Sequence, residues 1–129
     1  MSSGKLGQWN TPGSENSTAI MFYYVYVLQS QAVKRSSTAW QSVKNQELYI
    51  GHTINLRERL QEHNRGLNFS TKPYRPWQLI HFEAYRNEED AKRREKYLKT
   101  SQGARLLKRM LKEYFYHHKP SGQKIKSNF

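Results

Sequence analysis

The sequence contains no cysteine and no long apolar run. Without thiols the chain has no disulfide, no thiolate zinc site and no cysteine nucleophile, so any chemistry must come from other side chains. No segment approaches the roughly 20 apolar residues that span a bilayer, and no basic amphipathic anchor stands out. No secretory leader is visible either, so we expect an intracellular, cytoplasmic protein without a membrane partner.

Acidic residues are scarce as well. Asp and Glu number 10 against 22 Lys and Arg, which gives a formal net charge of +12. Clustered cations gain free energy by releasing counterions from a phosphate backbone, so this charge favours a nucleic-acid partner. An anionic membrane surface is the competing interpretation, and the missing apolar anchor disfavours it.

The 129 residues, 36% of them hydrophobic, have room for one domain of ordinary size and show no internal repeat. We expect a disordered leader over residues 1–20, a folded domain over 21–116 and a polar tail over 117–129. Nothing in the sequence requires an oligomer, so a monomer is favoured.

Hydrophobic patterning and capping residues predict six elements within that domain. Strands are expected over 20–28, 48–51 and 77–84, with Trp77, Leu79 and His81 on one face of the last. Helices are expected from Thr53 or Asn55 to about Asn64, from Asn87 to about Lys99, and over 102–116. Residues 30–47 are expected to form a long loop between antiparallel strands. The predicted fold is α/β, a small three-stranded antiparallel sheet flanked by about three helices.

Two of these helices place charge on the face that should be buried. Leu56, Leu60 and His63 follow the i, i+4, i+7 pattern, with Arg59 beside them. Glu95 lies between Ala91 and Leu98 on the apolar stripe of the next helix. Burying such groups costs several kcal/mol unless partners or a ligand compensate, so their position indicates a site.

Two tyrosines on neighbouring strands, Tyr26 and Tyr49, complete a set suited to phosphodiester chemistry. A carboxylate can hold a divalent cation, a guanidinium can neutralise charge on phosphoryl oxygens, and a hydroxyl or imidazole can help to deprotonate water. Taken singly, each residue also has an ordinary structural role. The tyrosines can pack in the sheet, His63 can be a satisfied helix histidine, and Glu95 can pair with Arg94 or a lysine.

Taken together, their order and spacing resemble the GIY-YIG endonucleases, most closely the small stand-alone bacterial domains. Tyr24-Val25-Tyr26 stands at the GIY element, and Tyr49-Ile50-Gly51 is an intact YIG element. Arg59 follows Tyr49 by ten residues, His63 comes four later, and Glu95 lies in AKRREKYLK. The resemblance covers about residues 22–116.

The resemblance implies a metal-dependent endonuclease that hydrolyses DNA phosphodiester bonds, structure-selective in repair or recombination. Tyr26 and Tyr49 would bind and help to deprotonate the attacking water, and Arg59 would stabilise the transition state. His63 would bond near the nucleophile, and Glu95 would be the lone protein ligand of Mg²⁺ or Mn²⁺. Tyr24 replaces the first glycine, the two tyrosine elements are unusually far apart, and no asparagine supports Glu95 near Leu107.

Basic and polar residues around this set are expected to bind DNA, namely His52, Lys72, Arg75 and Arg94. Contacts of this kind position the backbone without reading its sequence. The alternatives are a non-catalytic basic nucleic-acid-binding module with the same fold, and a basic structural protein of a ribonucleoprotein particle.

Overall fold

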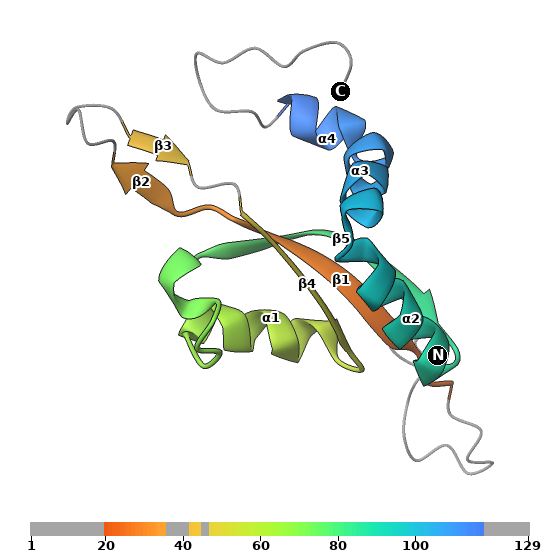
Figure 1. The fold of residues 1–129 in the computed structure, drawn as a ribbon. Helices are drawn as coiled ribbons and strands as arrows, with labels where there is room; N and C mark the ends of the chain where they lie inside the picture. Colours follow the sequence, from red (N-terminus) through yellow and green to blue (C-terminus); the bar gives the residue numbers. More distant parts are fainter. Residues whose placement is uncertain (1–19, 36–41, 45–46, 118–129) are drawn as a thin grey trace, which may run out of the picture.

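The central element of the computed structural model, which describes residues 20–35, 42–44 and 47–117, is a three-stranded antiparallel sheet in the order β4-β1-β5 (Figure 1). The strands are β1 (Tyr23–Ser30), β4 (Leu48–Thr53) and β5 (Trp77–Tyr85). In this register Tyr26 of the middle strand lies opposite Gly51 on one side and Phe82 on the other. The α/β class and the antiparallel sheet are as predicted.

Helices cover both faces of the sheet. One face is covered by α1 (Leu56–Arg65), and the other by α2 (Glu88–Leu98) and α3 (Ser101–Met110) (Figure 1). The N-caps of α1 and α2 and the C-cap of α1 are among those the sequence predicts, whereas the Thr100 cap of α3 was not predicted. The Asn55 side chain accepts a hydrogen bond from the Glu58 N–H at 3.0 Å, and Asn87 accepts one from Glu89 at 2.8 Å. Gly66 ends α1 with φ +80°, a conformation that favours glycine.

The alternation of β1 divides the apolar residues into two cores. Val25 and Val27 point towards α2 and α3, where they pack with Ala91, Leu98 and Leu107. Tyr26 and Leu28 point to the opposite face and pack with Trp77, with Leu56 and Leu60 of α1 against them. Tyr26 therefore belongs to the core on the α1 side.

The segment 30–47, expected to be a long loop, contains paired strands. The described part includes β2 (Val33–Arg35) and β3 (Ser42–Lys44), which run antiparallel in a separate two-stranded sheet. The Ser30 N–H bonds to the Glu47 carbonyl at 2.8 Å, so the chain enters and leaves this hairpin beside β1 and β4. Each short strand contains one β-branched residue, Val33 or Val43, which is too few to predict a strand in a polar segment.

Two further details differ from the sequence prediction. A register shift in β5 pairs Val27 with His81 and Leu28 with Leu79, so His81 lies on the α2 side and not with Trp77 and Leu79. The predicted terminal helix is divided at Leu111 into α3 and α4 (Lys112–His117). This turn lets the Tyr114 hydroxyl donate a hydrogen bond to the Gln29 side chain at 2.6 Å.

The remaining described element is the short 3₁₀ helix η2 (Lys72–Tyr74), which precedes a cis peptide bond between Arg75 and Pro76. The predicted leader and tail, apart from Ile20 and His117, lie outside the described residues. Among the helices that are described, none has the length and apolar character to cross a membrane.

Candidate active site

Tyr26 and Gly51 define the centre of the site. The Tyr26 side chain is 3% exposed and extends across the edge strand β4 at Gly51. A Cβ atom at position 51 would lie 2.5 Å from the Tyr26 hydroxyl oxygen. Residue 51 is therefore a glycine because the phenol occupies the space that a side chain would take.

A buried hydrogen-bond chain holds the Tyr26 hydroxyl. Its oxygen lies 3.0 Å from Nε2 of His63, whose Nδ1 lies 2.8 Å from the Thr71 hydroxyl oxygen. The Thr71 hydroxyl in turn donates to the Asn68 carbonyl at 3.4 Å. These bonds are all satisfied when His63 is neutral, donates from Nδ1 to Thr71 and accepts at Nε2 from the phenol. His63 is thus placed to receive the proton of Tyr26.

The protonation states of Tyr26 and His63 follow from the burial of this hydrogen-bond chain. Burial raises the pKa of the Tyr26 phenol, and Tyr49 and Glu95 act in the same direction against the nearby Arg59. Burial also lowers the pKa of His63, and the positive charge of Arg59 lowers it further. Both groups are therefore neutral near pH 7. Proton transfer from the phenol needs additional positive charge at the site.

Tyr49 and Arg59 flank the buried hydrogen-bond chain. The Tyr49 ring centroid lies 4.8 Å from that of His63 and 6.2 Å from that of Tyr26. The expected buried position of Arg59 is not found, because its side chain is 41% exposed and donates to Glu62 at 3.1 Å. The guanidinium is therefore open to a ligand from solvent, and its positive charge acts on the Tyr26 phenol.

Glu95 approaches the same edge strand from the opposite face of the sheet. Its carboxylate is 15% exposed, with Oε1 2.5 Å from Nδ1 of His52 and Oε2 2.8 Å from Nζ of Lys99. Burial alone would raise the pKa of Glu95, but hydrogen bonds from Lys99 and His52 hold it below its ordinary value. Glu95 is a carboxylate at neutral pH, and it is close enough for its charge to act on Tyr26.

The donor set around Glu95 suits one kind of metal site only. In the described ranges, no group of three or more His, Asp or Glu side chains could enclose a cation. Mg²⁺ does not need such a cage, because it commonly keeps several waters and binds one or two carboxylates together with substrate phosphates. Glu95 is a single carboxylate, and its partner Lys99 has a long side chain that is 53% exposed and can move aside. It therefore fits this mode of Mg²⁺ binding. The residues therefore fit a cation held largely by water and phosphate.

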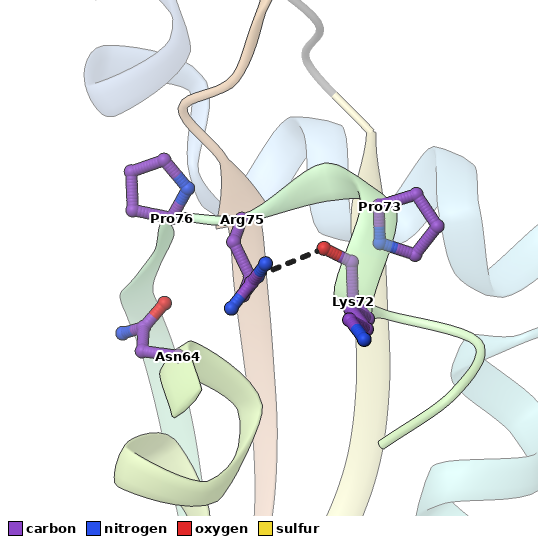
Figure 2. Close-up of a pocket in the computed structure, with 5 residues that line it drawn as sticks. All are labelled: Asn64, Lys72, Pro73, Arg75 and Pro76. Carbon is purple, nitrogen blue, oxygen red and sulfur yellow. Dashed lines mark hydrogen bonds between the residues drawn. The ribbon is translucent and has the colours of Figure 1, made fainter. Parts of the chain in front are cut away.

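Lys72 and Arg75, both predicted to bind substrate, line one open hollow of about 490 Å³ with Asn64, Pro73 and Pro76 (Figure 2). Arg75 Nε donates a hydrogen bond to the Lys72 carbonyl at 3.0 Å, which holds the Arg75 side chain beside the Lys72 backbone. Neither cation has an acidic partner among the described side chains. Two unpaired positive charges in one hollow favour an anion such as phosphate.

Arg94, also predicted to bind substrate, lies in a different environment. Its guanidinium donates two hydrogen bonds to the Glu83 carboxylate of β5, at 2.8 and 3.1 Å. Burial would raise the pKa of Glu83, but hydrogen bonds from Arg94, His81 and Tyr85 lower it to about 2. The structure thus gives Arg94 a role in joining α2 to the sheet. A role in substrate binding stays a prediction.

Two residues of the site, Thr71 and Lys99, are not among those that the sequence predicts. Thr71 follows His63 by eight residues in a polar loop, where no periodicity relates the two positions. Lys99 was within reach of prediction, because it follows Glu95 by four residues on one helix.

The fold and this arrangement of tyrosine, histidine, arginine and glutamate define a small α/β domain with a phosphodiesterase-like site. A sequence model described as the GIY-YIG catalytic domain matches residues 22–110. The chain therefore belongs to the GIY-YIG nuclease family, as the motifs predicted.

Relatives of two kinds are similar to parts of the chain. A UPF0213 protein of Pediococcus pentosaceus is 51% identical over 45 residues, which cover 34% of this chain and 47% of that protein. A UPF0213 protein of Clostridium perfringens is 34% identical over 77 residues, which cover 59% of this chain and 69% of that protein.

The second kind is a protein of Drosophila persimilis named as a structure-specific endonuclease subunit SLX1 homolog. It is 35% identical over 63 residues, which cover 46% of this chain and 19% of that protein. The chain thus spans about half the length of the first of these relatives and a smaller part of the last. No solved structure matches the chain significantly.

Proposed function

We propose that this protein is a metal-dependent endonuclease that hydrolyses DNA phosphodiester bonds. The observation that supports it most is the convergence, at the edge strand β4, of the Tyr26–His63 pair and the Glu95 carboxylate. Family membership and the net charge of +12 favour the same activity on a polyanionic substrate.

In this proposal the buried hydrogen-bond chain handles the proton of the attacking water. The Tyr26 hydroxyl holds the water, and the phenol passes its own proton to Nε2 of His63 as it takes up the proton of the water. Tyr49 packs against the imidazole and holds its ring in this orientation. The exposed guanidinium of Arg59 stabilises the charge that develops on the phosphoryl oxygens.

Glu95 would hold the cation, Mg²⁺ or Mn²⁺, after Lys99 or His52 moves aside. Such a cation supplies charge stabilisation to the phosphate and lowers the pKa of bound water. His52, as a polar group beside Glu95, and the hollow at Lys72 and Arg75 would bind the DNA backbone. These contacts carry no base sequence information, so we expect selection by DNA structure.

The relatives named structure-specific endonuclease subunits support a branched substrate, as in DNA repair or recombination. We propose that the chain acts inside the cell, where its DNA substrate lies, and that it acts as a monomer.

The direct test is cleavage of flapped, nicked, four-way and continuous duplex DNA by the purified chain with Mg²⁺, Mn²⁺ or EDTA. We expect cleavage with either metal and none in EDTA. Glu95→Gln should lower the rate by about 100-fold or more. The matched control is Glu58→Gln, the same change at an exposed glutamate of α1, which should cleave as wild type does.

If wild type binds DNA but cuts none of these substrates with any metal, the protein is the non-catalytic nucleic-acid-binding module. If Glu95→Gln cleaves as fast as wild type, the assignment of the cation site is wrong.

A further inference from the structure

Phe69 is 92% exposed, the highest value among the large apolar side chains in the described part of the chain. Its neighbour Leu67 is 67% exposed. Burying a phenylalanine typically stabilises a protein by about 1.5–3 kcal/mol, a gain that this fold does not use at position 69. A single exposed apolar residue needs no explanation by itself, so its surroundings decide whether Phe69 has a function.

The loop that carries Phe69 is held in one conformation by its own hydrogen bonds. The Asn68 side chain accepts from the Ser70 N–H at 3.0 Å, from the Ser70 hydroxyl at 2.8 Å and from the Thr71 N–H at 3.3 Å. The Trp77 indole donates to the Thr71 carbonyl at 2.9 Å. The backbone at Phe69 is therefore held in place, which lowers the backbone entropy lost when a ligand binds to the ring.

The same loop is attached to the proposed active site. Thr71 is bonded to His63, and Phe69 is only two residues before it. Two residues of extended chain span about 7 Å at most, and stacked nucleotides of one strand are about 3.4 Å apart. The hydrogen bonds of 2.8 Å from Thr71 to His63 and of 3.0 Å from His63 to Tyr26 complete the path, so the Phe69 ring is within a few nucleotides of a phosphate held at Tyr26.

Positive charge follows the exposed ring directly. Lys72 and Arg75 come three and six residues after Phe69 and line the open hollow described above. An aromatic ring on the same loop as cations that can contact a phosphate backbone is a combination that proteins use to bind unpaired bases. A continuous duplex must first be unstacked, at a cost of a few kcal/mol per base step, before the ring can contact a base face, so its main gain is from the charge contacts.

We propose that Phe69 stacks on an unpaired base within a few nucleotides of the cleaved phosphate and thereby favours branched DNA over continuous duplex. This inference depends on the proposed DNA-cleaving function, and it adds the residue that recognises the branch. The ligand class is a DNA strand with at least one unstacked base at a junction. A protein partner on the same ring is the competing outcome.

The test compares binding of wild type and Phe69→Ala to a flapped DNA and to a continuous duplex, in EDTA so that no DNA is cut. We expect Phe69→Ala to lose about 5- to 100-fold in flap affinity and to keep its duplex affinity. Phe69→Trp should keep both. The matched control is Val33→Ala on β2, a residue 61% exposed and outside the loop, which should change neither affinity.

A spectroscopic readout locates the contact. With 2-aminopurine at the first unpaired position of the flap, wild type should quench or shift its emission and Phe69→Ala should not. The same thermal melting curve for both proteins will show that folding is unchanged, as the exposure of the ring predicts.

Equal flap-to-duplex affinity ratios for wild type and Phe69→Ala would overturn the inference, and would leave the ring for a protein partner. That result would not affect the proposed function if wild type still cleaves DNA in Mg²⁺. Conversely, loss of flap binding in Phe69→Ala with no cleavage by wild type would support stacking and reject the nuclease activity.

Discussion

The hydroxyl of Tyr26 lies 3.0 Å from Nε2 of His63, so a residue of the middle strand and a residue of α1 share one buried hydrogen bond. Thr71 binds the other nitrogen of the same imidazole at 2.8 Å. A strand, a helix and a loop thus meet at one ring. The orientation of that ring decides which nitrogen faces the phenol.

Replacing Thr71 by valine should slow DNA cleavage without unfolding the protein. Valine keeps the shape of the side chain but removes the hydroxyl that accepts a hydrogen bond from His63 Nδ1. The proton is then no longer held on Nδ1, so Nε2 is no longer fixed as the nitrogen that accepts from the phenol. We expect a decrease of about 10- to 100-fold in the cleavage rate and a changed rate profile with pH. Thr71→Ser, which keeps the hydroxyl, should restore most of the rate. Equal profiles for wild type and Thr71→Val would show that Thr71 only packs.

Gly51→Ala should separate catalysis from DNA binding. The new methyl group would meet the Tyr26 hydroxyl at 2.5 Å, so the phenol must move away from His63. Misplacing a reacting group by about 1 Å can cost about 100-fold in rate, whereas the cationic surface proposed to bind DNA is untouched. Cleavage kinetics and DNA affinity, measured on the same preparation, check this. An alanine variant with the full cleavage rate would exclude a direct role for Tyr26.

Lys99→Met should lower the Mg²⁺ concentration needed for half-maximal cleavage. The Lys99 ammonium contacts Glu95 at 2.8 Å and competes with a metal cation for the same carboxylate oxygen. Because Lys99 is 53% exposed, its ion pair is worth little, and the shift should be about two- to fivefold. A metal titration of the cleavage rate measures it. Lys96→Met, an exposed lysine of the same helix, is the control and should shift nothing.

Glu83 should make folding stability depend on pH in the acid range. Its pKa is lowered from 4.5 to about 2 in the folded protein, so the native state favours the ionised form of Glu83 more than the unfolded chain does. The stabilisation is present above about pH 4.5 and is lost as the pH falls towards 2. It amounts to about 2 to 3 kcal/mol.

Urea unfolding of wild type and Glu83→Gln at several pH values measures this effect. The variant should be less stable than wild type at pH 7, and the difference should shrink as the pH falls through that window. A difference that is constant down to pH 2 would show that Glu83 contributes by packing alone. Glu58→Gln again serves as the exposed control.

Local signals in the sequence predicted the elements that hold the candidate site residues. Asn55, Gly66 and Asn87 mark helix ends because each makes its bond or its backbone turn within a few residues. The buried position of His63 and the partly buried position of Glu95 followed from helical periodicity, because both lie on the stripe of their apolar neighbours.

The remaining features depend on contacts between distant segments. The Arg94–Glu83 pair joins α2 to β5, and no spacing rule relates the two positions before the helix is placed on the sheet. The shift that moves His81 to the other face arises from pairing with Val27 on another strand. Arg59 is exposed because Glu62 and solvent solvate its guanidinium, although its helical position suggested burial.

The division of the core by the sheet has a consequence for assembly of the reaction centre. Tyr26 and His63 belong to the layer under α1, whereas Glu95 arrives with α2 on the reverse side. A partly folded chain with only one helical layer docked would hold half of the machinery and cut nothing. Nuclease activity would therefore report that both layers have closed on the sheet, which gives a functional readout of complete folding.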